Sequence, residues 1–255
     1  MRLIGELWRS LIEALEGLGA ISRFLLRLIA DSPRALLRFD LIAKQIFNSG
    51  ALSLVIIMLS GLFVGMVLGL QGFQLLQRFG SEEALGSAAA IGLVRELSPV
   101  ITALLFAGRA GTALASELGL MRATDQLSAM EMMAVDPIRR VVVPRFLGGV
   151  ITMPLLTAIF SVIGLYGAQL VGVQIMGVDS GSFWSQMQAA VELRDINEGF
   201  TKSCIFGVAC SLIAVYQGYN AMPTAEGVGL ATTRTVVTSA VVVLFLDYLL
   251  TSAFL

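Results

Sequence analysis

Two adjacent charged residues, Arg95 and Glu96, interrupt a long apolar stretch of the sequence. Charged side chains within a membrane span are costly, and they usually face a partner or a water-filled space. Neighbouring residues of a helix point in different directions, so each of the two is predicted to need its own partner. An arginine at the mouth of an apolar cavity can hold a phosphate group through two hydrogen bonds. The alternative is that both residues lie at the outer face of the membrane, where charge is tolerated.

A third charged residue, Asp247, lies well inside the last apolar stretch and has no oppositely charged neighbour in the sequence. We expect it to complete a buried network with Arg95 or Lys202. A structural role is favoured over a proton relay, because the chain has no histidine and no series of acidic residues along a path.

Other kinds of chemistry are not indicated. The sequence lacks a G-x-x-x-x-G-K-[ST] phosphate loop, so this chain is not expected to hydrolyse ATP. Without histidine or a nucleophile–base pair, it is not predicted to be an enzyme. Cys204 and Cys210 share one apolar stretch, where a structural role is favoured, and nothing resembles a metal site. The net charge of -1 gives no indication of nucleic-acid binding.

The composition is that of a membrane protein. Of the 255 residues, 56% are hydrophobic and only 14% are charged, whereas a soluble domain carries about 25% charged residues. Backbone polar groups in lipid must be paired within the chain, and the long apolar stretches favour helices over the alternating strands of a barrel. The sequence therefore predicts one all-α domain embedded in the membrane.

Five stretches are long enough to cross a hydrocarbon core of about 30 Å. Three have no charged residue, and two contain a few. The alternative for the second stretch is a pair of half-helices divided at Pro99. The predicted spans are centred on residues 52–70, 84–115, 146–178, 203–225 and 235–255.

The distribution of Lys and Arg predicts the topology. Four of the 17 basic residues are assigned to one side of the membrane, namely Arg78, Arg95, Arg194 and Lys202, and the other thirteen to the opposite side. Because cytoplasmic segments carry the excess of Lys and Arg, the N-terminus is predicted to be cytoplasmic. With five spans, the C-terminus lies outside.

Residues 1–45 are predicted to form an interfacial region, and residues 46–255 the five-span core of the same single domain. Apolar residues recur every three to four positions between charged ones, which is typical of an amphipathic helix lying in the cytoplasmic interface. The alternative is a helix packed against a partner protein. The apolar positions are Leu3, Leu7, Leu11, Ala14, Leu15, Leu18, Phe24, Leu25, Leu28 and Ile29.

Small residues repeat every four positions in the first two spans. Such a series lets another helix approach closely. Packing within the chain is favoured over a specific dimer contact. The two series are Gly61, Gly65 and Gly69, and Ala103, Ala107, Gly111 and Ala115.

A short amphipathic helix is predicted between the second and third spans, within residues 119–135. Thr124 is expected to cap it, with Asp125 in its first turn, and Asp136-Pro137 to end it. A helix this short is poorly stable alone, so we expect it to dock into another protein. The alternative is that it lies on the membrane surface. The residues proposed for docking are Leu127 and Met130, on one face with Ala134, together with Thr124, Asp125 and Glu131.

Several segments resemble one known family. GLVRELSPVITALLFAGRAGTALASELG, MRATDQLSAMEMMAVDP and AEGVGLATTRTVVTSAVVVLFLDYLLTSAFL are similar to the MlaE (YrbE-like) permeases. The resemblance covers essentially the whole chain. It implies a fold with an interfacial N-terminal helix, five spans and a cytoplasmic coupling helix.

The same resemblance implies the permease subunit of an ABC transporter in the inner membrane of Gram-negative bacteria. Such a transporter moves phospholipid between the inner and outer membranes and maintains outer-membrane lipid asymmetry. The expected partners are a second copy of the permease, a cytoplasmic ATPase that binds ATP and Mg, a hexameric MCE-domain protein and a STAS-domain protein. No cofactor is expected in this chain itself.

The resemblance also implies a lipid cavity between two permease copies. Its expected apolar lining is Leu68, Leu76, Phe79 and Leu97. Its expected polar gate is Arg95 and Glu96. The resemblance also implies a basic position near the cytoplasmic end of the last span, at Arg234.

Two other functions remain open from the residues alone. An ion-coupled secondary transporter would be expected to contain inverted repeats, which the sequence lacks. A membrane scaffold that only anchors a partner would tolerate charge changes at Arg95 and Glu96.

Overall fold

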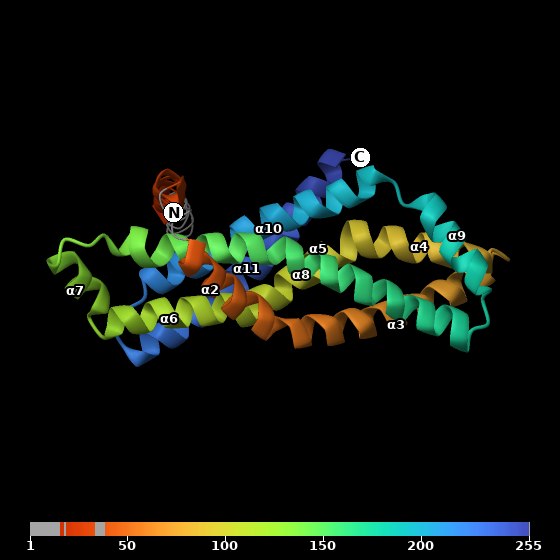
Figure 1. The fold of residues 1–255 in the computed structure, drawn as a ribbon, viewed down its shortest axis with the longest axis horizontal. Coiled ribbons are helices and arrows are strands. Elements are labelled where there is room, and N and C mark those ends of the chain that lie inside the picture. Colours follow the sequence, from red (N-terminus) through yellow and green to blue (C-terminus); the bar gives the residue numbers. More distant parts are fainter. Residues whose placement is uncertain (1–15, 18, 34–38, 255) are drawn as a thin grey trace, which may run out of the picture.

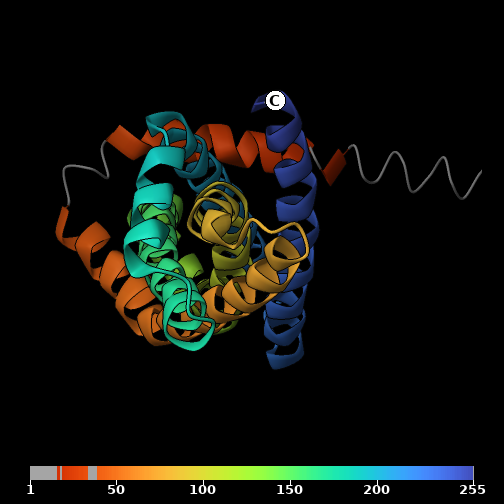
Figure 2. The same ribbon diagram turned by 90° about the vertical axis from the view of Figure 1, so that its right-hand side faces the viewer.

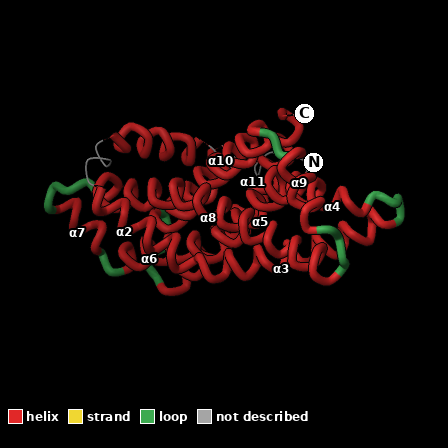
Figure 3. Tube along the Cα trace, turned by 45° about the vertical axis from the view of Figure 1, so that its right-hand side comes forward, coloured by secondary structure: helices red, strands yellow, loops and turns green. Residues whose placement is uncertain are grey.

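The computed structural model describes residues 16–17, 19–33 and 39–254, and in these ranges the chain is helical nearly throughout, with short loops (Figures 1 and 3). Five helical stretches are long and apolar enough to cross a membrane, which confirms the predicted fold class and span number. These stretches are Phe39–Gln77, Glu82–Ala123, Ile138–Ile175, Leu193–Tyr219 and Ala225–Phe254.

Several of these stretches contain more than one helical segment. The first joins α2 (Phe39–Gly50) to α3 (Leu54–Gln77) through a 3-10 turn, so the helix begins several residues before the predicted boundary at 45. The remaining helices are α4 (Leu85–Ile91), α5 (Ser98–Phe106), α6 (Thr112–Ala123), α7 (Gln126–Met132), α8 (Val143–Gln169), α9 (Ser180–Ala190), α10 (Leu193–Tyr219) and α11 (Ala225–Phe254).

The second span is one continuous helix rather than two half-helices. A π-helical segment, Gly92–Leu97, directly precedes Ser98 and Pro99. A proline inside a helix removes one backbone hydrogen bond and crowds the carbonyl four residues earlier. The wider π turn accommodates both effects without breaking the helix. A second π segment, Ala107–Gly111, joins α5 to α6.

The glycine series of α3 lies against α8. A methyl group at Gly69 would come within 2.8 Å of the Ala168 carbonyl oxygen, and one at Gly65 would overlap the Gly164 backbone. Only the absence of a side chain lets the two helices approach this closely, as is common in membranes. The favoured interpretation, packing within the chain, is therefore confirmed.

The bundle has two distinct ends, which we call the α7 end and the α9 end (Figure 1), and Figure 2 views it from the α9 end. Helix α9 marks one of these ends, and its Phe183 is fully buried against Phe73 and Leu85. Asp179 begins this helix by accepting a hydrogen bond from the Ser182 amide at 2.7 Å.

The helix of residues 19–33 packs against the α7 half of the bundle. Leu28 is fully buried, and Phe24 and Leu25 pack against the same core cluster as Phe146 and Val215. Three of the four predicted apolar positions described here thus face the chain's own helices, whereas Ile29 is 54% exposed. The positions predicted on Leu3 to Leu15 and Leu18 lie outside the described residues, and the interfacial location stays a prediction.

Candidate functional site

Ionised side chains join the second and fourth spans toward the α9 end. Arg95 pairs through Nε with Oε2 of Glu198 at 2.8 Å and through Nη1 with Oδ1 of Asp195 at 3.6 Å. The other carboxylate oxygen of Glu198 pairs with Nε of Arg194 at 2.8 Å. Asp195 and Glu198 are buried, so their charges need these cations. The guanidinium of Arg95 is therefore engaged by carboxylates of α10.

Lys202 connects the same region to the last span. Its side chain is fully buried, and Nζ donates hydrogen bonds to Glu96 and, at 2.8 Å, to the hydroxyl of Thr251. Asp247 Oδ1 lies 3.6 Å from this nitrogen. An unpaired ammonium group would be very costly here. The expected network around Asp247 is confirmed, with Lys202 as its partner.

We call these seven side chains the ion-pair cluster. It contains three cations and four carboxylates, so its net charge is negative when all are ionised. A phosphate group would have to displace carboxylates from Arg95 in order to bind there. The members are Arg95, Glu96, Arg194, Asp195, Glu198, Lys202 and Asp247.

The prediction that Arg95 and Glu96 cannot pair directly is wrong. Arg95 Nε lies 3.5 Å from Glu96 Oε1. Both side chains are long, and both make contacts with α10, so their charged ends meet although their Cα atoms are adjacent. The sequence analysis also missed Asp195 and Glu198. Glu198 and Asp195 lie four and seven residues before Lys202 on one helix face, and this spacing is a signal that could have identified them.

An apolar hollow lies between α3 and Leu97, the residue that follows Arg95 and Glu96. Its volume is about 350 Å³, and every lining residue except Gln71 is apolar. It brings together two of the predicted cavity residues, Leu68 and Leu97, from different spans. The full lining is Phe63, Val64, Val67, Leu68, Gln71 and Leu97.

The other predicted cavity residues lie elsewhere. Leu76 packs against the small core cluster beneath α9. Phe79 follows α3 and is 75% exposed. Arg234 is exposed on α11, thirteen residues before Asp247, which is about 20 Å along the helix axis. Within this single chain, these three residues do not line the hollow.

The predicted coupling segment forms α7, but its boundaries differ from the prediction. Thr124 does not cap α7, because its hydroxyl donates to the Leu120 carbonyl at 2.9 Å, at the end of α6. Asp125 precedes the helix with a φ of 56° and makes no capping hydrogen bond. A residue in the left-handed region reverses the chain direction here. The helix ends at Met132, and Asp136 instead accepts from the Ile138 amide at 2.9 Å.

The two faces of the coupling segment have different surroundings. Leu127 is buried, and Met130 packs against the chain's own core. Met132 and Met133 are 85% and 67% exposed. Ala134 has a φ of 58° and lies beyond the end of α7, so it does not share the predicted face. The two methionines are therefore the most exposed large apolar side chains of this segment, and Val135 beside them is 38% exposed.

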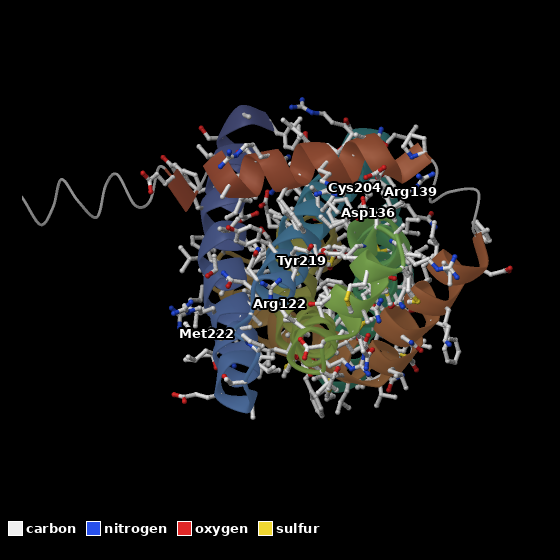
Figure 4. All side chains as sticks on the ribbon, turned by 90° about the vertical axis from the view of Figure 1, so that its left-hand side faces the viewer. Arg122, Asp136, Arg139, Cys204, Tyr219 and Met222 are labelled. Atoms are coloured by element: carbon white, nitrogen blue, oxygen red, sulfur yellow. The ribbon has the colours of Figure 1, made fainter. Side chains whose placement is uncertain are left out.

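Contacts at the α7 end connect the coupling segment to the rest of the bundle (Figure 4). Arg122 donates to the Tyr219 carbonyl at 2.9 Å and lies over its ring. Arg27 pairs with Asp136 at 2.9 Å. These contacts link the ends of α6 and α10 and link the residues after α7 to the helix of residues 19–33.

Comparison with known proteins identifies close relatives. The family model described as permease MlaE matches residues 42–253. The chain is 52% identical over 253 residues to the intermembrane phospholipid transport system permease protein MlaE of Haemophilus influenzae, covering 99% of this chain and 97% of that protein. It is 35% identical to a probable ABC transporter permease protein of Rickettsia bellii, covering 100% and 98%. It is 32% identical to the chloroplastic protein TRIGALACTOSYLDIACYLGLYCEROL 1 of Arabidopsis thaliana, covering 83% and 60%.

Proposed function

Since this chain belongs to the MlaE permease family, we propose that it is the membrane subunit of an ABC transporter for phospholipid. In this proposal the transporter moves phospholipid between the inner and outer membranes and thereby maintains the lipid asymmetry of the outer membrane. The relative named for intermembrane phospholipid transport, which aligns over nearly the whole chain, supports this assignment.

The apolar hollow is the structural observation that carries the proposal. Leu68 and Leu97 line it with four neighbouring side chains and offer almost no polar surface. Such a surface suits acyl chains, because each buried CH₂ contributes roughly 0.8 kcal/mol. A second permease copy facing the hollow would enclose it on its open side. We infer that Leu68 and Leu97 contact acyl chains there.

The ion-pair cluster acts in this proposal as a gate support rather than as a phosphate site. It fixes Glu96 and Arg95 against α10 and α11, directly before Leu97 in the chain. A movement of α10 or α11 would therefore be transmitted to the wall of the hollow through ion pairs. Movement of a partner ATPase against α7 is the proposed source of that displacement.

The proposed orientation places the α7 end in the cytoplasm of the cell and the α9 end in the periplasm. The described basic side chains separate between these ends, with Arg27 and Arg122 at the α7 end and Arg194 at the α9 end. This separation agrees with the excess of Lys and Arg on the cytoplasmic side of membrane proteins. The N-terminus is then cytoplasmic and the C-terminus periplasmic, in the inner membrane.

The proposed partners are a second permease copy, a cytoplasmic ATPase that binds ATP and Mg, an MCE-domain hexamer and a STAS-domain protein. The chain has no phosphate loop of its own, so ATP hydrolysis requires another subunit. The exposed Met132 and Met133 at the end of α7 provide an apolar contact for the ATPase. Flexible methionine side chains adapt well to a partner's surface.

A photocrosslinking amino acid at Leu97 tests the lipid assignment. The assembled complex is extracted in detergent and washed before irradiation, so that bulk lipid is removed. We expect a phospholipid adduct from Leu97. A crosslinker at Val162, which is 65% exposed on α8 and outside the hollow, serves as the control. Equal labelling at both positions, or none at Leu97, would contradict the proposal.

A further inference from the structure

Arg109 lies deep within the second span, where a charge is costly. Between Glu96 and Glu117 the helix carries no other charged residue. At 1.5 Å per residue, Arg109 is about 20 Å from Glu96 and about 12 Å from Glu117. It therefore lies within the length of a hydrocarbon core, in the half nearer the α7 end. Charged residues at such depths generally face a partner or a cavity.

The hydrogen bonds of Arg109 leave its charge unneutralised. Nη1 donates to the Asn48 carbonyl at 3.1 Å and to the Ser53 hydroxyl at 3.2 Å, and both acceptors are neutral. Among the residues that the structure describes, no carboxylate lies within ion-pair distance of it. The donors on Nε and Nη2 make no hydrogen bond within that part of the chain. This arginine thus retains both its charge and free donors.

A polar cavity adjoins the guanidinium. It lies between α2 and α6 with a volume of about 210 Å³, several times the roughly 30 Å³ that a water occupies in the liquid. Glu117, the one carboxylate among its described lining residues, pairs with Arg145 at 3.2 Å and so does not neutralise Arg109. The polar lining is Gln45, Asn48, Ser49, Arg109 and Glu117, and the apolar lining is Leu52, Ala110, Ala113 and Leu114.

We propose that this cavity binds the phosphate group of a phospholipid from the leaflet at the α7 end, with Arg109 as the cation. Arginine binds phosphate strongly because its planar fork forms two parallel hydrogen bonds. The amide and hydroxyl groups of Gln45 and Ser49 provide further donors. Leu52, which is 61% exposed at the rim, would contact the acyl chains. This inference rests on the proposed transport of phospholipid, and it adds a site distinct from the apolar hollow.

A crosslinker at Leu52 in the washed, detergent-extracted complex tests the proposal, with cellular phospholipid labelled by ³²P. We expect a labelled phospholipid adduct. Arg109→Gln should reduce it about tenfold or more, since a charge-assisted hydrogen bond contributes about 1.5–3 kcal/mol. Arg109→Lys should retain part of it. An adduct that does not depend on Arg109, an adduct to another protein chain, or no adduct would overturn the proposal.

A second pair of variants keeps Arg109 in place in case its replacement prevents folding. Ala113 lies one helical turn after Arg109 and lines the cavity, so Ala113→Glu would pair with the arginine in the i, i+4 arrangement. We expect Ala113→Glu to abolish the Leu52 adduct and Ala113→Gln, of the same size, to preserve it. An equal effect of both variants would contradict an electrostatic site.

Two further measurements are needed. One distinguishes a lipid phosphate from free phosphate, and the other distinguishes this site from the apolar hollow. Binding of ³²P inorganic phosphate to the purified complex, dependent on Arg109 and without a lipid adduct at Leu52, would identify a free-phosphate site and overturn the lipid assignment. The Leu97 crosslinker reports on the hollow independently. Labelling at Leu97 without labelling at Leu52 would refute this inference alone, whereas its absence at Leu97 would refute the proposed function.

Discussion

The two arginines inside the second span occupy opposite surroundings on one helix. Arg95 lies within ion-pair distance of Glu96, Asp195 and Glu198. Arg109, about 20 Å away along the axis, bonds only neutral acceptors among the residues that the structure describes, and it faces a cavity. The charge of Arg95 is compensated within the chain, whereas no carboxylate in the described part of the chain compensates that of Arg109.

This difference separates stabilising groups from groups available to a ligand. A buried charge that is fully paired becomes costly only when one partner is removed, so it constrains the fold. A charge with neutral partners and an adjacent cavity gains most from an external anion. The same distinction, between contacts closed within the chain and groups left open, applies to the glycines and to the coupling segment.

The largest effect on stability is expected from removing Lys202, the buried cation of the ion-pair cluster. Lys202→Met leaves Asp247 without its cation and Glu96 with only Arg95, and should destabilise the protein by about 3–5 kcal/mol. Thermal unfolding of the purified complex in detergent measures this. Adding Glu96→Gln and Asp247→Asn to the same variant should restore most of the stability, because no unpaired charge then remains. An unchanged unfolding temperature for Lys202→Met would show that the cluster does not constrain the fold.

The difference between Arg95 and Arg109 is tested by replacing each arginine with glutamine. Arg95→Gln leaves the buried Asp195 without its cation and Glu198 with only the exposed Arg194, and should cost about 2–4 kcal/mol. Arg109→Gln loses two hydrogen bonds to neutral groups and should cost about 1 kcal/mol, while it removes the lipid adduct at Leu52. Unfolding temperature and adduct yield, measured on both variants, provide the two readouts. Equal losses of stability would remove the distinction.

The sequence was sufficient for the fold because apolar length and charge distribution depend on local composition. All five predicted spans are present. The site was harder to predict, because ion pairs connect residues far apart in the chain. Glu96 and Lys202 meet across 106 positions, and no spacing rule for one helix relates them.

The coupling segment was mispredicted for a different reason. Thr124 is followed by an acidic residue and an apolar pattern, which is typical of a helix start. The preceding helix, α6, competes for the same hydroxyl, and it extends to Ala123. The buried face of α7 was likewise assigned to a partner, because a sequence pattern identifies an apolar face without identifying what covers it.

Two glycines, one packed against another helix and one with open space beside it, should differ in the same way. The expected effect on stability is intermediate in size. Gly65→Ala would place a methyl group against the Gly164 backbone and should cost about 1–3 kcal/mol through overpacking. Gly108→Ala, beside Arg109, meets no atom within 4 Å. It should be neutral or stabilise the protein by up to about 1 kcal/mol, because alanine favours the helix. Unfolding temperatures of the two variants give the contrast, and a destabilising Gly108→Ala would indicate that this surface is covered in the complex.

The smallest effect on stability is expected at the exposed methionines, where the effect on assembly should be large. Replacing Met132 and Met133 by serine removes no contact within the described core and should change stability by less than about 0.5 kcal/mol. The ATPase recovered on purification of the permease should nevertheless decrease. Leu127→Ala, on the buried face, should instead cost about 2–5 kcal/mol. Full ATPase recovery with the serine variant would return the docking role to Leu127 and Met130, and would mean that α7 must detach from its own core before a partner can bind.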